Sequence, residues 1–295
     1  MPSMPAQIRI VTYNIQRAIH LSALLELFES APAFRDADIV AIQEATYLPD
    51  GRNVLERLAH VLSPDHLWTY RTVMAYPDKE YGNGFLFRQS TRVLASRPVP
   101  LPVVTRLRWY EKQKTEGGRP DTKSALVQTF QLGDWTIRVA NVHLDFAGGW
   151  RHRRTQLDHL LEAVDAEGDR PEPGHDEARL DVVCGDFNTV GQYRLPPARR
   201  DTRRSLAAAT RRGYVDATAG IRYTSDLFGS IDPADPAGGF LRLGRRGGMH
   251  FRQKTDHVLV RGHVMPASSR IVDHPESELF EISDHLPIEL TLRPR

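Results

Sequence analysis

Short apolar runs that stop in polar side chains recur along this sequence and predict a fold built on β-strands. The run Val182–Cys184 stops at Gly185 and is followed by Asp186 and Asn188. Residues two apart in an extended backbone point to the same face, so this pattern predicts a carboxylate and an amide side by side at a strand end. The alternative is a strand followed by an Asx-type turn, because Gly-Asp-x-Asn is also ordinary turn composition.

Five further segments share the pattern. They are Ile8–Val11 before Asn14, Asp38–Ile42 before Gln43 and Glu44, Trp135–Ala140 before Asn141 and His143, Thr255–Val260 with Asp256 near its start, and Asp284 and His285 before Ile288–Leu292. Each has an ordinary explanation, since a strand needs polar residues where it meets water. Asparagine, glutamate, aspartate and histidine are also the residues that bind hard divalent cations and transfer protons. Their recurrence at so many strand ends favours a functional site.

Taken in order, these segments resemble the endonuclease/exonuclease/phosphatase superfamily, the fold group of DNase I. The resemblance rests on Thr-Tyr-Asn-Ile at 12–15, Gln-Glu at 43–44, Asn-Val-His-Leu at 141–144, Gly-Asp-Phe-Asn at 185–188, Asp-His-Val at 256–258 and Ser-Asp-His at 283–285. It implies a DNase I-like α/β fold, a four-layer α/β sandwich in which two mixed β-sheets pack face to face with flanking helices. Because Asn14 and His285 belong to one motif set, we expect residues 1–295 to form a single catalytic domain.

The resemblance implies a metal site and a water-activating pair. Glu44 is the expected primary ligand of Mg²⁺, for which Mn²⁺ can substitute, since a carboxylate is the usual protein anchor for a cation that keeps several waters. Asn14 and Asp284 are expected to complete or border this site. Asp186, together with Asn188, is expected to position and activate the attacking water.

Two histidines are expected to act on the phosphate itself. By resemblance, His143 contacts the phosphate or assists the leaving group, and His285 donates to a phosphoryl oxygen or takes part in proton transfer. Asp256 is expected to hold His285 in its useful tautomer, as a carboxylate partner does for a catalytic imidazole. The neighbouring His257 alternates to the opposite face and is left out of the site. Asn83 is a candidate substrate contact, although a tight turn explains a Gly-Asn-Gly segment equally well.

Local patterns predict the other elements. Helical spacing of apolar residues predicts helices over Leu21–Ser30, Arg52–Leu62 and Gly148–Val164. A hairpin is predicted for Ala125–Gln131 and Trp135–Ala140. Two long loops are expected, an acidic one at 165–180 and a second at 224–250 that is rich in Gly, Asp and Pro.

Composition narrows the class of protein. Cys184 is the only cysteine, so no intrachain disulfide can form, and its place inside an apolar run predicts a small buried side chain rather than a nucleophile. The N-terminus has neither a basic nor an apolar leader-like region, and no apolar run reaches the length of a membrane span. These features predict a cytoplasmic protein without stable membrane insertion, and they predict no particular protein partner.

The distribution of arginine bears on the substrate. Residues 194–212 contain seven arginines and one acid, and residues 242–254 contain five basic residues and no acid. Stretches of this kind beside a cleft attract a polyanion, although a chain with only five lysines uses arginine for nearly all its cations. The formal net charge of +2 decides nothing.

Three functions remain in view. The primary prediction is a Mg²⁺-dependent phosphodiesterase or nuclease that acts on nucleic acid by metal-assisted attack of an Asp-activated water. The alternative is the same chemistry on a phospholipid headgroup or a small phosphoester, as in sphingomyelinase-like relatives. A binding module that has lost catalysis is disfavoured, because every expected metal and base residue is present.

Overall fold

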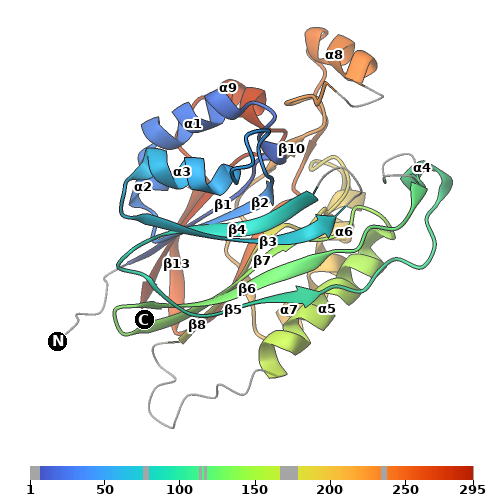
Figure 1. Ribbon diagram of the computed structural model, residues 1–295. Helices are drawn as coiled ribbons and strands as arrows, with labels where there is room; N and C mark the ends of the chain where they lie inside the picture. The colour runs from blue at the N-terminus through green and yellow to red at the C-terminus, as the bar shows by residue number, and fades with distance from the viewer. Residues whose placement is uncertain are drawn as a thin grey trace.

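The computed structural model describes residues 7–75, 80–112, 115, 118–166, 179–233 and 238–294. Two six-stranded sheets make up the centre of the molecule (Figure 1). The first sheet contains, in spatial order, β13 (Val264–Ile271), β14 (Ile288–Pro294), β1 (Ile8–Asn14), β2 (Ile39–Ala45), β4 (Glu80–Arg88) and β3 (His66–Ala75). The second contains β5 (Arg92–Pro100), β6 (Ser124–Leu132), β7 (Trp135–His143), β8 (Arg179–Asp186), β12 (Asp256–Gly262) and β9 (Val215–Asp216). A separate ribbon pairs β10 (Ser225–Asp226) with β11 (Arg252–Gln253).

Both sheets are mixed, because β1–β2 and β7–β8 are parallel pairs among antiparallel ones. Helices cover their outer faces (Figure 1). The first sheet is covered by α1 (Leu21–Ser30), α2 (Pro32–Asp36), α3 (Val54–Leu62) and α9 (Glu276–Ile282). The second is covered by α5 (Gly149–Ala166) and α7 (Ala207–Arg211), and α6 (Pro196–Ser205) packs against α5. The remaining helices are the short 3-10 turn η1 (Gln16–Ala18), α4 (Trp109–Lys112) and α8 (Gly238–Arg246). The predicted sandwich of two mixed sheets with flanking helices is confirmed.

Side chains alternate between an inner core and two outer ones. On β1, Ile10 faces the core between the sheets, whereas Val11 faces the helices outside. In the inner core, Phe130 of the second sheet makes edge contacts with Phe85 and Phe87 of the first, each with a centroid distance of 5.4 Å. Because both faces of the central strands are buried, these strands appear in the sequence as continuous apolar runs.

The predicted helices and the hairpin are present. Helix α1 has the predicted bounds, and α3 begins at Val54 because the Asn53 side chain caps it by accepting from the backbone N–H of Leu55 at 3.0 Å. Strands β6 and β7 form the predicted antiparallel hairpin. The prediction of one long loop over 224–250 is wrong, because β10 and α8 lie within it. Helix α8 packs Gly244 so closely on Phe228 that an added Cβ would lie 2.5 Å from the ring. Most of the predicted acidic loop, residues 167–178, lies outside the described residues.

The end of β8 explains the glycine in its motif. Gly185 has a φ of +130°, and a Cβ there would lie 2.1 Å from the carbonyl oxygen of Val142 on β7. A side chain is therefore excluded where the two strands approach before the polar residues begin.

Cys184 points into the inner core, and burial raises the pKa of its thiol to about 12, as expected for a packing residue. No helix in the described part of the chain combines the length and the apolar character needed to cross a bilayer.

A contact between a histidine and a carboxylate lies beside this strand end. His257 is fully buried, and its Nδ1 lies 3.1 Å from Asp216 Oδ2 on β9. Burial alone would raise the pKa of Asp216, but His257 and Lys254, together with a hydrogen bond from Thr218, hold this pKa well below its usual range. The carboxylate therefore stabilises the fold above its ordinary pKa of 3.8, and this contribution is lost as the pH falls toward the lowered value.

We expect Asp216→Asn to lower the free energy of unfolding at neutral pH by about 1–3 kcal/mol, because it removes a charge-assisted hydrogen bond. The difference from the wild type should shrink below about pH 4, where the unfolded wild-type carboxylate binds a proton. Urea unfolding at several pH values measures both effects. A difference that stays constant down to about pH 3 would contradict this role for Asp216.

Candidate active site

Three strand ends of the second sheet form a row of polar side chains. Strand β7 ends at His143, β8 ends at Asp186, and β12 begins at Asp256. His143 pairs with Asp186 in the parallel register, and Asp256 pairs with Asp186 in the antiparallel one. The end of two strands and the start of the third therefore meet at the same edge of the sheet.

The first sheet brings Asn14 and Glu44 to this row. Strand β1 ends at Asn14, and β2 runs parallel to it with Gln43 opposite. Glu44 follows with a φ of +56°, inside an irregularity of the β2–β4 pairing that turns its side chain toward the row. The amide of Asn14 donates to Glu44 Oε1 and to Asp186 Oδ2, both at 3.3 Å, so it links the polar ends of the two sheets.

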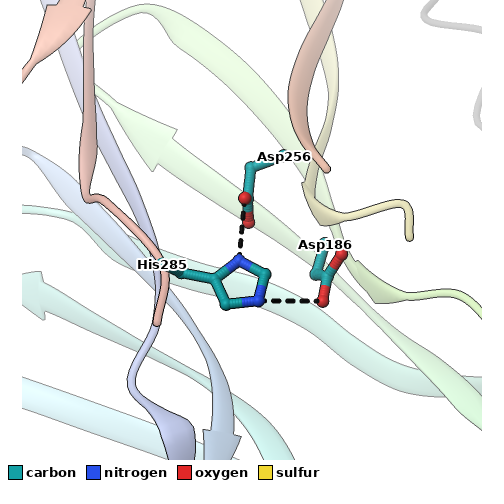
Figure 2. Close-up of side chains that lie close together, drawn as sticks. All are labelled: Asp186, Asp256 and His285. Carbon is teal, nitrogen blue, oxygen red and sulfur yellow. Dashed lines mark hydrogen bonds and ion pairs between the residues drawn. The ribbon is translucent and has the colours of Figure 1, made fainter. Parts of the chain in front are cut away.

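The imidazole of His285 lies between two carboxylates (Figure 2). Its Nδ1 is 2.8 Å from Asp256 Oδ2, and its Nε2 is 3.6 Å from Asp186 Oδ2. Asp256 Oδ2 also accepts hydrogen bonds from the hydroxyls of Thr224 at 2.7 Å and Thr255 at 2.8 Å. Three donors thus fix the carboxylate that orients the ring.

The loop that carries His285 is attached to the start of the chain. The hydroxyl of Ser283 donates to the backbone carbonyl of Asn14 at 2.8 Å and accepts from the backbone N–H of His285 at 3.2 Å. Residues from the first and the last strand segments therefore occupy one cluster, and a serine between α9 and His285 is what connects them.

The two histidines of the cluster have opposite electrostatic surroundings. Burial lowers the pKa of His143 well below its usual value, and the nearby Lys123 and His285 add to this effect. Burial alone would also lower the pKa of His285, but Asp256, Asp186 and Asp284 together raise it well above its usual value. At neutral pH the cluster therefore holds a neutral His143 beside a protonated His285.

Burial raises the pKa of Asp186 to about 7, although the neighbouring His285 opposes the shift. The adjacent Asp256 adds to the rise by repulsion. Burial likewise raises the pKa of Asp284 to about 6, and repulsion by Glu44 contributes. Each shift reports carboxylates held close together in a buried place, an arrangement that a cation would stabilise.

Two groups of side chains could hold such a cation. Ligand atoms of Asp186, Asp256 and His285 lie within 4.8 Å of one another. A metal bound there by Nδ1 of His285 would displace its 2.8 Å contact with Asp256. The carboxylates of Glu44 and Asp284, with the amide of Asn14, offer oxygen donors instead, and these suit Mg²⁺ better than an imidazole does.

The prediction that Asp186 and Asn188 extend side by side is wrong, and the alternative turn is what forms. Asn188 has a φ of +50°, and its backbone N–H donates to Asp186 Oδ1 at 2.8 Å. This hydrogen bond forms an Asx-type turn directly after the strand ends. The amide of Asn188 donates to the carbonyl of Leu144 at 2.9 Å, so it holds the loop after His143.

Asn83 lies beneath the cluster, with an exposed fraction of 0%. Its Nδ2 donates to the backbone carbonyl of Asn141 at 3.0 Å, and its Oδ1 has no hydrogen-bond partner among the described residues. Asn141 itself donates to the carbonyls of Ile42 and Gly84 and accepts from the amide of Gln43 at 2.7 Å. Amide side chains therefore connect the two sheets below the site. The motifs contain these residues, but nothing in their spacing indicates this contact.

Arg17 is a site residue that the sequence analysis does not identify. Its Nε lies 3.6 Å from Glu44 Oε2, and its Nη2 donates to Asp232 Oδ2 at 2.6 Å. The chain reaches this place through consecutive left-handed residues, with φ of 46° at Gln16, 58° at Arg17 and 54° at Ala18. Left-handed backbone at residues other than glycine has no clear sequence signal, so local pattern does not reveal this arginine.

A sequence model of the Endonuclease/Exonuclease/phosphatase family matches residues 11–285, which include the whole cluster from Asn14 to His285. The chain belongs to this family. Phosphoester hydrolysis, generally dependent on a divalent metal, is the chemistry of the family. Among curated proteins, none matches the chain.

Solved structures share the fold at low sequence identity. An endonuclease/exonuclease/phosphatase family protein from Leptotrichia buccalis C-1013-b is 14% identical with a TM-score of 0.64, over 97% of this chain and 99% of that one. TDP2 from D. rerio, complexed with single strand DNA product, is 16% identical with a TM-score of 0.61, over 98% and 100%. ANGEL2, described as a 2′,3′-cyclic phosphatase, is 15% identical with a TM-score of 0.58, over 97% and 95%.

Proposed function

We propose that this protein is a Mg²⁺-dependent phosphodiesterase that acts on nucleic acid. The observation that carries the proposal is the position of His285 between Asp256 and Asp186, at the edge where Asn14 and Glu44 also lie. Hydrolysis of a phosphodiester needs an oriented water, a donor to the phosphoryl oxygen and neutralisation of charge. The cluster contains a group for each requirement.

Glu44 would hold Mg²⁺, or Mn²⁺ in its place, with Asn14 and Asp284 completing or bordering the site. When bound, the cation supplies positive charge against the phosphate oxygens. Asp186 accepts a hydrogen bond from the attacking water and so orients the water oxygen toward phosphorus. The same carboxylate takes the proton that the water loses as it attacks. Asn188 supports this carboxylate through its backbone N–H, which donates to Asp186 Oδ1.

His285 donates from Nε2 to a phosphoryl oxygen, because Asp256 occupies its Nδ1. His143 approaches Asp186 from the other side, with its Nε2 at 3.6 Å from Oδ2, and contacts the phosphate or the leaving oxygen. Asn83 is fully buried and its Nδ2 already donates to Asn141, so its proposed contact with the substrate requires Oδ1 to become accessible when the substrate binds.

The choice of nucleic acid is supported by the arginine-rich stretch at 194–212, which begins six residues after Asn188. The TDP2 structure, which shares the fold, is complexed with a single strand DNA product. The alternative substrate, a phospholipid headgroup or a small phosphoester, is favoured by a different feature. Helix α8 exposes Phe240 and Leu243, at 66% and 70%, beside three arginines, a composition found in helices that lie on membranes.

We expect the wild type to nick supercoiled plasmid DNA in Mg²⁺ and to lose this activity in EDTA. Glu44→Gln should raise the Mg²⁺ concentration for half-maximal rate by at least about tenfold, because it removes the anionic ligand. Titration calorimetry with Mn²⁺ measures the same loss without turnover. Parallel assays use a phospholipid headgroup analogue and a small phosphodiester. If the protein hydrolyses one of these compounds but leaves DNA intact, the nucleic-acid assignment is contradicted. If it hydrolyses no phosphoester at all, the whole proposal is contradicted.

A further inference from the structure

A buried ion pair holds two outer helices against the active-site loops. Arg153 of α5 is fully buried, and its Nη2 donates to both carboxylate oxygens of Asp201 on α6 at 2.8 Å. Arg153 Nη1 donates to the carbonyl of Phe146, three residues after His143. Asp201 accepts from the backbone N–H of Val190, two residues after Asn188. Helices α5 and α6 are therefore placed beside the loops that leave the ends of β7 and β8.

The outer face of this helix pair carries arginines without acidic partners. They are Arg151, Arg154, Arg199, Arg200, Arg203 and Arg204, and all but the half-buried Arg154 are exposed. In the part of the chain that the structure describes, none of these six forms an ion pair, whereas Arg153 and Arg212 are paired. The only acid of α6, Asp201, is already taken by Arg153. We call these six arginines the α5–α6 face, and it has a net positive charge.

An aromatic side chain lies within this face. The indole ring of Trp150 has the guanidinium of Arg151 at 5.3 Å and that of Arg204 at 5.0 Å from its centroid. Two left-handed glycines, Gly148 and Gly149, bring the chain from the His143 loop to this tryptophan. Phe146, 41% exposed, lies in the same loop. Aromatic rings and guanidinium planes are the surfaces on which unpaired bases stack.

We propose that the α5–α6 face binds one single strand of nucleic acid and leads it to the active site from the His143 and Asn188 side. The strand's phosphates lie along the arginines, and a base stacks at Trp150. A single strand is required because a base in a duplex has no free face for stacking. Helix α6 exposes no large apolar side chain between Pro196 and Ser205, so this face lacks the apolar stripe that a membrane-bound helix needs. The inference rests on the proposed function and names the substrate's path.

The test is binding of fluorescein-labelled oligo(dT) to the full chain in EDTA, followed by anisotropy over a range of NaCl concentrations. Arg200→Ala/Arg204→Ala should weaken binding and reduce the slope of log affinity against log salt by about 1.4, the value for two phosphate contacts on a single strand. Trp150→Ala should weaken binding about 5- to 150-fold and leave that slope unchanged. The matched control is Arg92→Ala/Arg293→Ala. It removes two exposed arginines at the ends of the sheets that lie away from the active site, and it should change neither the affinity nor the salt slope.

Equal weakening by the control pair, or an unchanged salt slope in Arg200→Ala/Arg204→Ala, would overturn the inference. So would binding of anionic phosphatidylserine vesicles that is as tight as oligo(dT) binding and equally sensitive to Trp150→Ala. The assay needs no turnover, so its outcome is separate from that of the proposed function. If the protein nicks plasmid DNA but neither variant weakens its binding to oligo(dT), only the proposed path is contradicted. Binding as described in a protein that hydrolyses no phosphoester would contradict the activity alone.

Discussion

Asp186→Asn is expected to lower kcat/KM for phosphodiester hydrolysis by about 10²–10⁴-fold, the range for loss of a general base. The amide keeps the shape of the side chain but cannot take a proton from water. The free energy of unfolding should stay the same or rise, since the substitution removes a negative charge buried beside Asp256. Rates on plasmid DNA and on a small phosphodiester, with urea unfolding of the same preparations, measure both effects.

His285→Ala should lower kcat/KM by a similar factor. It removes the imidazole whose Nε2 lies beside Asp186 Oδ2 and donates to a phosphoryl oxygen in the proposed mechanism. Asp216→Asn is the matched control, since it makes the same chemical change at a half-buried aspartate of the same sheet, outside the cluster. It should lose stability and keep its rate. Near-wild-type rates in Asp186→Asn or His285→Ala would show that the site is assigned wrongly even though the fold is right.

Asp201→Ala is expected to lower the free energy of unfolding by about 3–5 kcal/mol, because it leaves the buried guanidinium of Arg153 without its carboxylate. Burial already lowers the pKa of Arg153 even with Asp201 present, which shows how unfavourable this position is for a charge. Urea unfolding followed by tryptophan fluorescence measures the loss.

Asp158→Ala is the control, because Asp158 pairs with Arg212 and Arg211 near the surface, where an ion pair contributes about 0–1 kcal/mol. The double variant Arg153→Met/Asp201→Leu should recover most of the stability, since an apolar pair of similar volume replaces the buried charges. If Asp201→Ala costs no more than Asp158→Ala, the Arg153–Asp201 pair does not hold the helices as described.

The strands and helices follow from local sequence pattern. The run before Gly185 is apolar at every position because Val182 and Cys184 face the inner core and Val183 faces the outer one. A strand buried on both faces must be apolar throughout, and it is recognisable for that reason. Helix α1 matched its predicted bounds because its apolar residues recur at helical spacing. Helix α8 was not predicted, because its glycines indicate a loop when the sequence is considered alone. In the structure, Gly244 lies in the helix and packs closely on Phe228.

The sequence by itself determined which polar side chains lie at strand ends, because burial of the preceding residues dictates where each strand meets water. Only the tertiary structure decided how those ends meet. The contact of Ser283 with Asn14 and the bond of Arg17 to Asp232 join residues that are far apart in the chain. Such contacts depend on how the two sheets and their loops pack, and no local propensity encodes them. The same packing leaves His143 neutral and His285 protonated, because burial and neighbouring charges, rather than residue type, set each pKa.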